Sequence, residues 1–373
     1  MKIPGYQRCV IGGGRNYRNR VPRDAATIEV SNWGQLRDAF AEADGDDIAY
    51  LTRSFDAEGE ISYDGPDGFV LASDRGIDGA RGATIDCDGG NAVLSFDSFA
   101  RVTGLDHKGP REEWLGEDAD QKRFDVGIRF NGPGGLVDNC ELRNWTSAAV
   151  ASSGSQPITL RHNYGHDNPA PALGYVIACR QNSGQDVITD NYFNRNRHSI
   201  ECESDAYGYV AKRNVQGPIM WNHAVDCHGG PNSRAARRIV IERNTCLSDG
   251  TETGSEHFVV IRGEPREVCI VRENQINDTN KARAVEQTSE TKYGQRNTWG
   301  SAANKSGLRN MRIEDNVFGD VSPSSSVGAG DGQQPEDDGI EAPPIQAGPR
   351  FGGDLGDLAL LGVGFWYLIR RGK

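Results

Sequence analysis

An asparagine that recurs about every two dozen residues is the feature that most restricts the fold of this chain. Each copy follows an aliphatic residue and two or three polar residues, and a short apolar stretch comes after it. The copies are Asn139, Asn163, Asn191, Asn214, Asn244, Asn274 and Asn316. Repeats of this length are typical of solenoids, whose coils bury their apolar faces against their neighbours. We therefore expect stacked coils with Asn at a turn, where it tolerates left-handed backbone and its amide bonds to the Asn of the next coil.

A second series, out of phase with the first, carries an aliphatic residue flanked by short alternating segments. Its members are Ile128, Val150, Ile177, Ile200, Val225, Ile261 and Val285. Alternation within each segment predicts strands and excludes repeats built from helices. Two strand registers that recur together predict an all-β chain that winds into a parallel β-helix, with strands about 4.8 Å apart.

Sequence composition divides the chain into four parts. Residues 1–25 form a basic N-terminal arm that we expect to be solvated, and residues 26–320 hold the repeats. Within the repeats, Trp33, Leu36 and Phe40 have helical spacing and predict one short helix with Ser31 as its N-cap. Residues 321–350 are rich in Ser, Gly, Pro and acidic residues, which predicts a flexible acidic linker. Residues 351–373 form an apolar tail.

Charge and hydropathy restrict the partners and the location. The net charge of −12 argues against a nucleic-acid partner. The segment 358–369 is apolar and is followed by two arginines, so the tail is a candidate membrane anchor. Twelve helical residues rise only about 18 Å, so a packed terminal helix stays an alternative. The start of the chain lacks the apolar core of a secretory signal. The expected location is extracellular or at the cell surface, with the export route open.

The body of the chain resembles the right-handed parallel β-helix proteins of the pectin lyase-like superfamily. The resemblance rests on the predicted N-terminal helix, which would cap the first coil, on the segments SDRGIDGARGATID and RVTGLDHKGP, and on the Asn-marked coils. Within that superfamily the chain is similar to uncharacterised surface proteins of salt-adapted archaea. The resemblance implies a right-handed solenoid, a polysaccharide or surface glycan as partner, and Ca²⁺ as the candidate cofactor. The motifs of polygalacturonases are absent, so no named activity transfers by residue.

One outward column of the second series gathers titratable residues. Aligning the series gives Arg129, Ala151, Ala178, Glu201, Asp226, Arg262 and Glu286. Glu201 and Asp226 would lie on neighbouring strands, where like charges raise one pKa and produce an acid and a base. Arg262 would anchor an acidic substrate. The expected substrate-binding residues nearby are His198, His223, His228, Glu264 and Arg266.

Two functions follow from this column. The first is a carbohydrate-active enzyme that binds and cleaves an acidic polysaccharide by lyase or glycoside hydrolase chemistry. The alternative is a non-catalytic surface or virion spike that binds glycans, in which the column is a solvated ladder of ion pairs. Spikes of this fold trimerise and enzymes stay monomeric, so both states stay open. His223, Asp226 and His228 offer metal ligands, but their spacing matches no zinc motif, so the metal ligands are unknown.

Three cysteines follow the same register two positions later. Cys179, Cys202 and Cys227 would therefore point inward on consecutive coils. We expect a stack of small buried thiols, because Cβ atoms on parallel strands in register point the same way.

Overall fold

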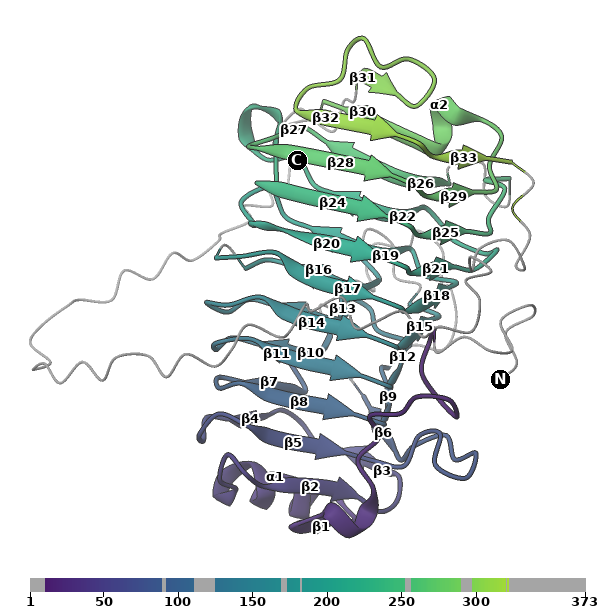
Figure 1. The fold of residues 1–373 in the computed structure, drawn as a ribbon. Coiled ribbons are helices and arrows are strands. Elements are labelled where there is room, and N and C mark those ends of the chain that lie inside the picture. The colour runs from purple at the N-terminus through teal and green to yellow at the C-terminus, as the bar shows by residue number, and fades with distance from the viewer. Residues whose placement is uncertain are drawn as a thin grey trace, which may run out of the picture. The chain divides into compact units, whose positions relative to one another are not determined.

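The computed structural model of the protein describes residues 11–88, 92–110, 125–168, 173–181, 183–251, 256–289, 297–319 and 321. These residues form stacked parallel sheets, an arrangement consistent with a parallel β-helix (Figure 1). The chain passes in turn through three sheets, here called sheets 1, 2 and 3, and each passage adds one strand to each sheet. The predicted all-β class is confirmed. The expected linker and apolar tail lie outside the described residues.

Sheet 1 has eleven strands, which all pair in parallel. In spatial order they are β1 (Ile28–Val30), β2 (Ile48–Leu51), β5 (Phe69–Ala72), β8 (Ala100–Thr103), β11 (Gly135–Asp138), β14 (Ile158–Arg161), β17 (Asp186–Thr189), β20 (Gly208–Lys212), β24 (Arg238–Glu242), β28 (Val268–Arg272) and β32 (Met311–Glu314).

Sheet 2 has ten short parallel strands that follow those of sheet 1 after a tight turn. They are β3 (Phe55–Ala57), β6 (Thr84–Cys87), β9 (Asp106–Lys108), β12 (Glu141–Arg143), β15 (Tyr164–His166), β18 (Tyr192–Asn194), β21 (Val215–Gln216), β25 (Thr245–Cys246), β29 (Gln275–Ile276) and β33 (Val317–Phe318).

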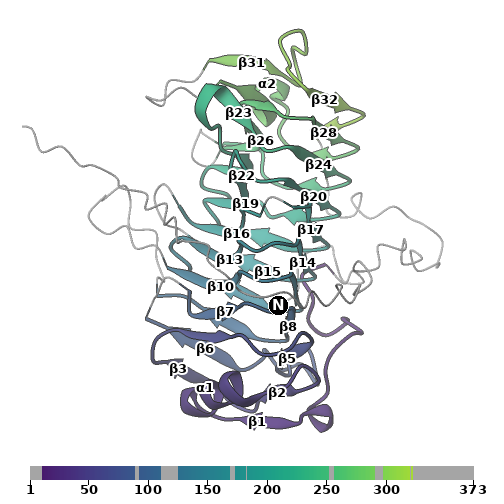
Figure 2. The same ribbon diagram turned by 90° about the vertical axis from the view of Figure 1, so that its left-hand side faces the viewer.

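Sheet 3 also has ten strands, and several of them follow one another in Figure 2. They are β4 (Ile61–Tyr63), β7 (Leu94–Phe96), β10 (Val126–Phe130), β13 (Ala148–Ser152), β16 (Tyr175–Cys179), β19 (His198–Cys202), β22 (His223–Cys227), β26 (His257–Arg262), β30 (Val285–Thr288) and β31 (Thr298–Ser301). The last strand is antiparallel to β30. A small separate sheet pairs β23 (Arg234–Ala235) with β27 (Glu264–Pro265).

Helices are few among the described residues. Helix α1 (Trp33–Glu42) lies beside β1 and β2 (Figure 1) and buries Trp33, Leu36 and Phe40, so the predicted helix is confirmed. The predicted N-cap is one residue wrong: the Asn32 side chain accepts the Gln35 N–H, while Ser31 bonds to the Gln35 side chain. The other helical segments are α2 (Lys281–Ala284) and the 3-10 turns η1 (Arg23–Ala25) and η3 (Pro231–Ser233).

The asparagine ladder is confirmed from Asn163 onward. Each side-chain amide donates to the Oδ1 atom of the next Asn, over 3.1 Å from Asn163 to Asn191 and 2.9 Å from Asn191 to Asn214. The ladder continues through Asn244, Asn274 and Asn316. Each ladder Asn also accepts a backbone N–H from the previous coil. The buried turn between sheets 1 and 2 is therefore satisfied by side chains.

The predicted register was wrong at its first member. Asp138 pairs with Arg161, so Asn139 aligns with His162 and Cys140 aligns with Asn163. The left-handed backbone also belongs to the preceding position, with φ of 56° at Asn139 and 55° at His162. The ladder asparagines are thus selected for their amide bonds, and the residue before each of them makes the turn.

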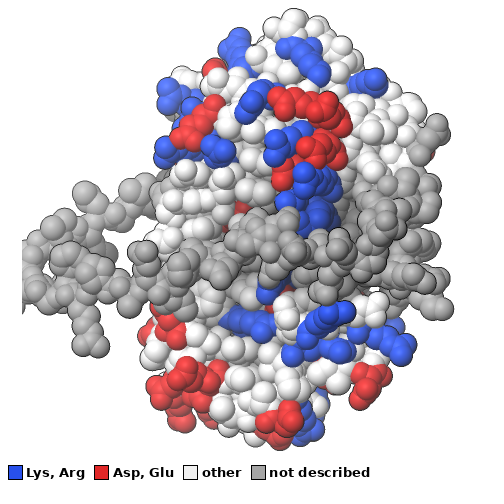
Figure 3. Space-filling model, viewed as in Figure 1, with Lys and Arg blue, Asp and Glu red and all other residues white. Residues whose placement is uncertain are grey.

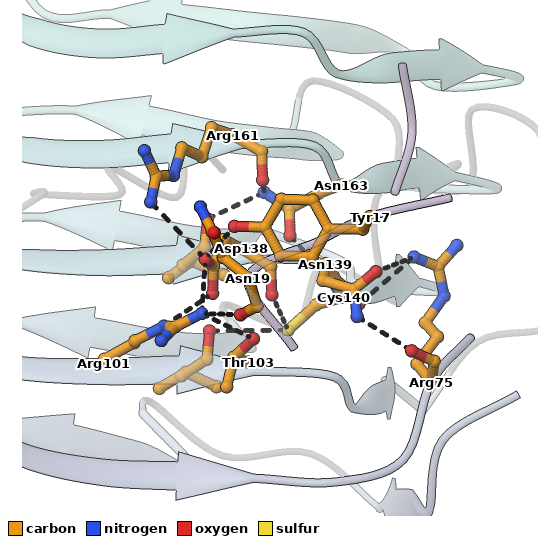
Figure 4. Close-up of polar contacts among 12 residues, drawn as sticks. Tyr17, Asn19, Arg75, Arg101, Thr103, Asp138, Asn139, Cys140, Arg161 and Asn163 are labelled. Atoms are coloured by element: carbon orange, nitrogen blue, oxygen red, sulfur yellow. Dashed lines mark hydrogen bonds and ion pairs between the residues drawn. The ribbon is translucent and has the colours of Figure 1, made fainter. Parts of the chain in front are cut away.

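The part of the N-terminal arm that is described does not lie free in solvent. Tyr17 is buried, and its hydroxyl donates to the Asp138 carboxylate, which also accepts two bonds from Arg101 (Figure 4). The Gly12 N–H donates to the Asp190 carbonyl over 2.9 Å. Residues 11–22 therefore pack across several coils, contrary to the expected solvated arm. The prediction rested on the arginines of this segment. Its glycines, however, allow the backbone to approach the coils closely.

Charges of both signs lie side by side over the face in front in Figure 3. On and beside sheet 1, arginines pair with carboxylates of neighbouring coils: Arg213 with Asp190 at 2.8 Å, Arg272 with Glu242 at 2.6 Å and Arg243 with Glu273 at 2.6 Å. This is the ladder of exposed ion pairs that the sequence suggested for the outward column, but it lies on a different sheet.

The cysteine stack is confirmed. Cys179 pairs in register with Cys202, and Cys202 with Cys227. All three are buried free thiols, and the sulfur atoms of Cys202 and Cys227 are 3.9 Å apart. They fill the core directly behind the outward column of sheet 3.

Candidate functional site

The strands of sheet 3 depart from simple alternation near their first residues. In β13, Ala149 and Val150 both belong to the main core, whereas Ala148 and Ala151 belong to a separate apolar cluster with Tyr175. The same holds one coil further for Val176 and Ile177. Because two consecutive residues point inward, the outward positions of strands such as β13, β16, β19, β22 and β26 are the first and fourth residues, followed by the sixth.

These positions build three outward rows on β19, β22 and β26. The first row holds His198, His223 and His257, the second holds Glu201, Asp226 and Val260, and the third holds Glu203, His228 and Arg262. We call the residues His198, Glu201, Glu203, His223, Asp226, His228, His257 and Arg262 the polar grid. The repeat pattern predicted Arg262 in line with Asp226, but Val260 is the residue in register with Asp226. Residues 259–261 are all aliphatic, and the repeat pattern matched Ile261 with Val225 where the structure pairs Val259 with Val225.

The first row is a line of three neighbouring imidazole rings, in which His223 and His257 meet edge to face. The ring centroids of His198 and His223 are 5.1 Å apart, and those of His223 and His257 are 5.0 Å apart. Nδ1 of His198 donates to the His223 carbonyl over 2.9 Å, since a carbonyl oxygen only accepts. Burial holds the pKa of His198 well below its usual range, so the ring is neutral and Nε2 keeps its lone pair. Burial also lowers the pKa of His223 to about 4.

Asp226 is fully buried at the centre of the polar grid. Its Oδ2 atom forms an ion pair with the Arg262 guanidinium and lies 3.2 Å from Nε2 of His228 and 3.4 Å from Nε2 of His198. Burial opposes ionisation, but the charges of Arg262 and His228 outweigh it and hold the pKa of Asp226 well below its usual range. Asp226 is therefore a carboxylate at every physiological pH.

Glu201 is the carboxyl group next to Asp226, one coil earlier in register. It is fully buried, and neither carboxyl oxygen has a hydrogen-bond partner among the described residues. Its Oε1 atom lies 3.7 Å from Nδ1 of His228. Burial, with smaller contributions from the charges of Glu203 and Asp226, raises the pKa of Glu201 to about 7 against the opposing charge of His228.

His228 connects the two carboxyl groups and reaches the surface, with 26% of its side chain exposed. Its two ring nitrogens face different residues, Nε2 facing Asp226 and Nδ1 facing Glu201. Burial disfavours the imidazolium, but the two carboxyl groups, Asp226 first, raise the pKa of His228 to about 9. The expectation that Glu201, Asp226, His198, His223 and His228 gather on consecutive coils therefore agrees with the geometry.

Two of the predicted substrate-binding residues make contacts elsewhere. Glu264 is in β27 and accepts from the Asn310 side chain over 3.1 Å. Arg266 is exposed and donates to the carbonyls of Asp205 and Ala206 over 2.8 and 2.6 Å. Both residues come after the end of β26, so their nearness to Arg262 in sequence does not bring them into contact with the two carboxyl groups.

Arginines that the repeat pattern did not single out lie near the polar grid. Arg180 is exposed and precedes Glu203 in the third row, and its charge acts on Glu201. Arg197 is half-buried beside Tyr175, and burial, with a contribution from the Arg262 charge, lowers its pKa. Alternation beyond the end of each strand could have revealed Arg180 and Glu203. Nothing in the repeat pattern pointed to Arg197, which precedes its strand.

The donor atoms of the polar grid do not fit the Ca²⁺ ion that the family resemblance implied. Two groups of side chains bring their ligand atoms within 4.8 Å of one another: His198, Asp226 and His228, and Glu201, Glu203 and His228. Ca²⁺ binds six to eight oxygen atoms. Imidazole nitrogens occur in both groups and replace oxygen ligands, so the polar grid is unsuited to Ca²⁺.

Comparison of the chain with protein-family models, with curated proteins and with solved structures finds no match. Among the described residues, no helix is both long and apolar enough to cross a membrane.

Proposed function

We propose that the protein binds an acidic polysaccharide on the outer face of sheet 3 and cleaves it at the polar grid. The observation that carries this proposal is the Glu201 carboxyl group, which is fully buried, has no hydrogen-bond partner among the described residues and faces His228 at 3.7 Å. A buried polar group without a partner costs stability, and such groups concentrate at functional sites.

The chemistry would use the contrast between the two neighbouring carboxyl groups. Asp226 is held ionised by Arg262, whereas Glu201 has a pKa of about 7 and can give or take a proton near neutrality. Carboxyl groups whose environments separate their pKa values are the usual acid and base of such sites. In a hydrolase Glu201 would protonate the leaving oxygen and Asp226 would act as base or nucleophile. In a lyase Glu201 would take the proton from the carbon next to the sugar carboxylate.

Positive charge beside the grid supports an acidic substrate. Arg180 is exposed, Arg197 is half-buried, and His228 carries a proton at neutral pH in the metal-free protein. Arginine binds the planar carboxylate of a uronic acid through two parallel hydrogen bonds. In this proposal Arg262 holds Asp226 in place through the ion pair between their side chains.

A glycan-binding surface or spike protein without catalysis is the second candidate. The buried ion pair of Arg262 and Asp226 favours this candidate. A carboxylate that is paired with an arginine is a structural feature of many ladders of ion pairs. Both candidates share a right-handed winding with α1 as the cap of the first coil, and a location at the cell surface. A trimer in solution would favour the spike, and a monomer the enzyme.

The deciding experiment is a cleavage assay on a panel of acidic and neutral polysaccharides, with calcium and with chelator, at moderate and high salt. Reducing ends and the absorbance of unsaturated uronate are measured for the wild type, for Glu201→Gln and for the control Glu273→Gln, which follows strand β28 of sheet 1. We expect new ends from the wild type and the control and a loss of at least about 100-fold in Glu201→Gln. Absorbance separates lyase from hydrolase. Equal activity of Glu201→Gln, or glycan binding without cleavage by the wild type, would refute the enzyme.

A further inference from the structure

We propose that His198, Asp226 and His228 bind one transition-metal ion of the zinc type. The three residues lie on two neighbouring coils of sheet 3, and their ligand atoms lie within 4.8 Å of one another. The sequence suggested His223, Asp226 and His228 as possible metal ligands. In the structure, His198 takes the place of His223. It lies on the neighbouring coil, and one of its ring nitrogens points at the Asp226 carboxylate.

The spacing of the donor atoms fits a small ion. Oδ2 of Asp226 lies 3.2 Å from Nε2 of His228 and 3.4 Å from Nε2 of His198. In a tetrahedral site with bonds of about 2.0–2.1 Å, neighbouring ligand atoms are about 3.3 Å apart. Both distances from Oδ2 already match this separation, so these two contacts would need little movement on binding.

The tautomer of His198 gives a second, independent argument. Nδ1 of His198 donates to the His223 carbonyl, so in the neutral ring the lone pair is on Nε2. That lone pair faces the Asp226 carboxylate at 3.4 Å inside the protein, and Nε2 has no hydrogen-bond partner among the described residues. Two acceptors that face each other without a proton repel. A cation between them removes the repulsion.

Each proposed ligand also has an outer partner of the kind that metal ligands use. His198 donates to a backbone carbonyl, Nδ1 of His228 faces the Glu201 carboxyl group, and Asp226 is held by Arg262. The acceptors fix the orientation of the two imidazoles and increase their basicity, and Arg262 fixes the orientation of the carboxylate. Two imidazoles and one carboxylate suit Zn²⁺, Co²⁺ and related ions better than Ca²⁺ or Mg²⁺.

The competing state is a proton in place of the metal. In that state His228 is an imidazolium that pairs with Asp226 and Glu201, and the polar grid needs no ion. The two states differ in metal content and are therefore separated by direct binding. The inference does not rest on the proposed cleavage, since the binding test contains no polysaccharide.

The test uses the full chain after treatment with chelator and desalting. Zn²⁺ is titrated by calorimetry, retained metal is counted by elemental analysis, and Co²⁺ reports the ligand geometry through its visible absorption. We expect one equivalent of Zn²⁺ and tetrahedral Co²⁺ bands for the wild type. His198→Gln and His228→Gln should bind at least about 10-fold more weakly, as even the loss of an outer partner has that effect. His257→Gln, in the same row but outside the cluster, is the control and should bind as the wild type does.

Stability gives a readout that separates lost binding from lost folding. Zn²⁺ should raise the melting temperature of the wild type and of His257→Gln, and leave His228→Gln unchanged, because only a ligand that binds the native state stabilises it. If His198→Gln does not fold, the partly exposed His228 decides the test. No retained metal in the wild type, or one equivalent retained in both folded variants, would overturn the proposal.

Discussion

Nε2 of His228 lies 3.2 Å from Oδ2 of Asp226, two residues earlier on the same outward face. Parallel stacking extends this pair into a cluster, because the preceding coil places His198 near Asp226 and Glu201 near His228. A single strand would present two side chains at this spacing. Two coils in register present a cluster, and its position is fixed by the backbone bonds of sheet 3.

Loss of Arg262 should destabilise the protein strongly. Arg262→Leu leaves the fully buried Asp226 carboxylate without its main counter-charge, and an orphaned buried charge costs about 3–5 kcal/mol. Arg243→Leu removes an exposed pair with Glu273 and should cost about 0–1 kcal/mol. Urea unfolding at neutral pH without metal measures both free energies. Adding Asp226→Asn to Arg262→Leu should recover part of the loss; equal costs for the two arginines would contradict the role of Arg262 as counter-charge.

The asparagine ladder should contribute to stability at every coil. Asn214→Ala removes an amide that donates to Asn244 and to the Ile188 carbonyl, and it leaves the Asn191 N–H without its acceptor. Each buried group that loses its partner costs about 1–3 kcal/mol. The exposed control Asn131→Ala should cost less than about 0.5 kcal/mol. Thermal and urea unfolding measure the difference, and similar values for the two variants would refute the role of the ladder.

Periodicity predicted the fold because the coils repeat their register with few errors. The inward cysteines and the Asn ladder occupy the expected positions, since the interior of a coil accepts only small or apolar side chains and the turn requires an amide. The register failed where the pattern itself was misleading. Asn139 occupies the left-handed turn position, one residue before the ladder position. Asn is tolerated at the turn position and at the ladder position, so the pattern did not distinguish them.

The polar grid could be predicted in part. Alternation brought Glu201 and Asp226 together, because parity along a strand decides which face a residue occupies. It misplaced Arg262, since it matched Ile261 with Val225, whereas Val259 is the residue in register with Val225. It also missed His198 as a partner of Asp226, because two consecutive inward residues, Ser199 and Ile200, bring His198 to the outer face against the parity rule.

The close approach of the N-terminal segment should depend on Gly13. A Cβ atom at this position would meet the His162 carbonyl oxygen at 2.2 Å and Oδ1 of Asn139 at 2.6 Å. Gly13→Ala should therefore release residues 11–22 from the coils, and trypsin should cut at Arg15 and Arg18 faster than in the wild type. Gly14→Ala is the matched control, because its φ of 83° is similar but no atom lies within 4 Å of the added Cβ. Equal protection of both variants would contradict this packing.

Acid should destabilise the protein partly through His107, which lies far from the polar grid in sequence and packs against Trp145 with ring centroids 4.8 Å apart. Burial lowers the pKa of His107 from 6.5 to about 4, although Gly127 and the Asp106 charge oppose the shift. Between these two values the unfolded chain binds the proton and the native protein does not. Stability therefore falls as the pH falls from about 6.5 to 4, by up to about 3 kcal/mol from this group.

The variant His107→Leu isolates that contribution, because leucine is apolar and cannot titrate. The difference in unfolding free energy between wild type and variant should change in favour of the variant as the pH falls from 7 to about 4. Above pH 7 the difference should be constant, since the imidazole is neutral in both the folded and the unfolded chain. Urea unfolding at a series of pH values measures it. A difference that stays constant over the whole range would mean that His107 is protonated equally in the folded and unfolded protein.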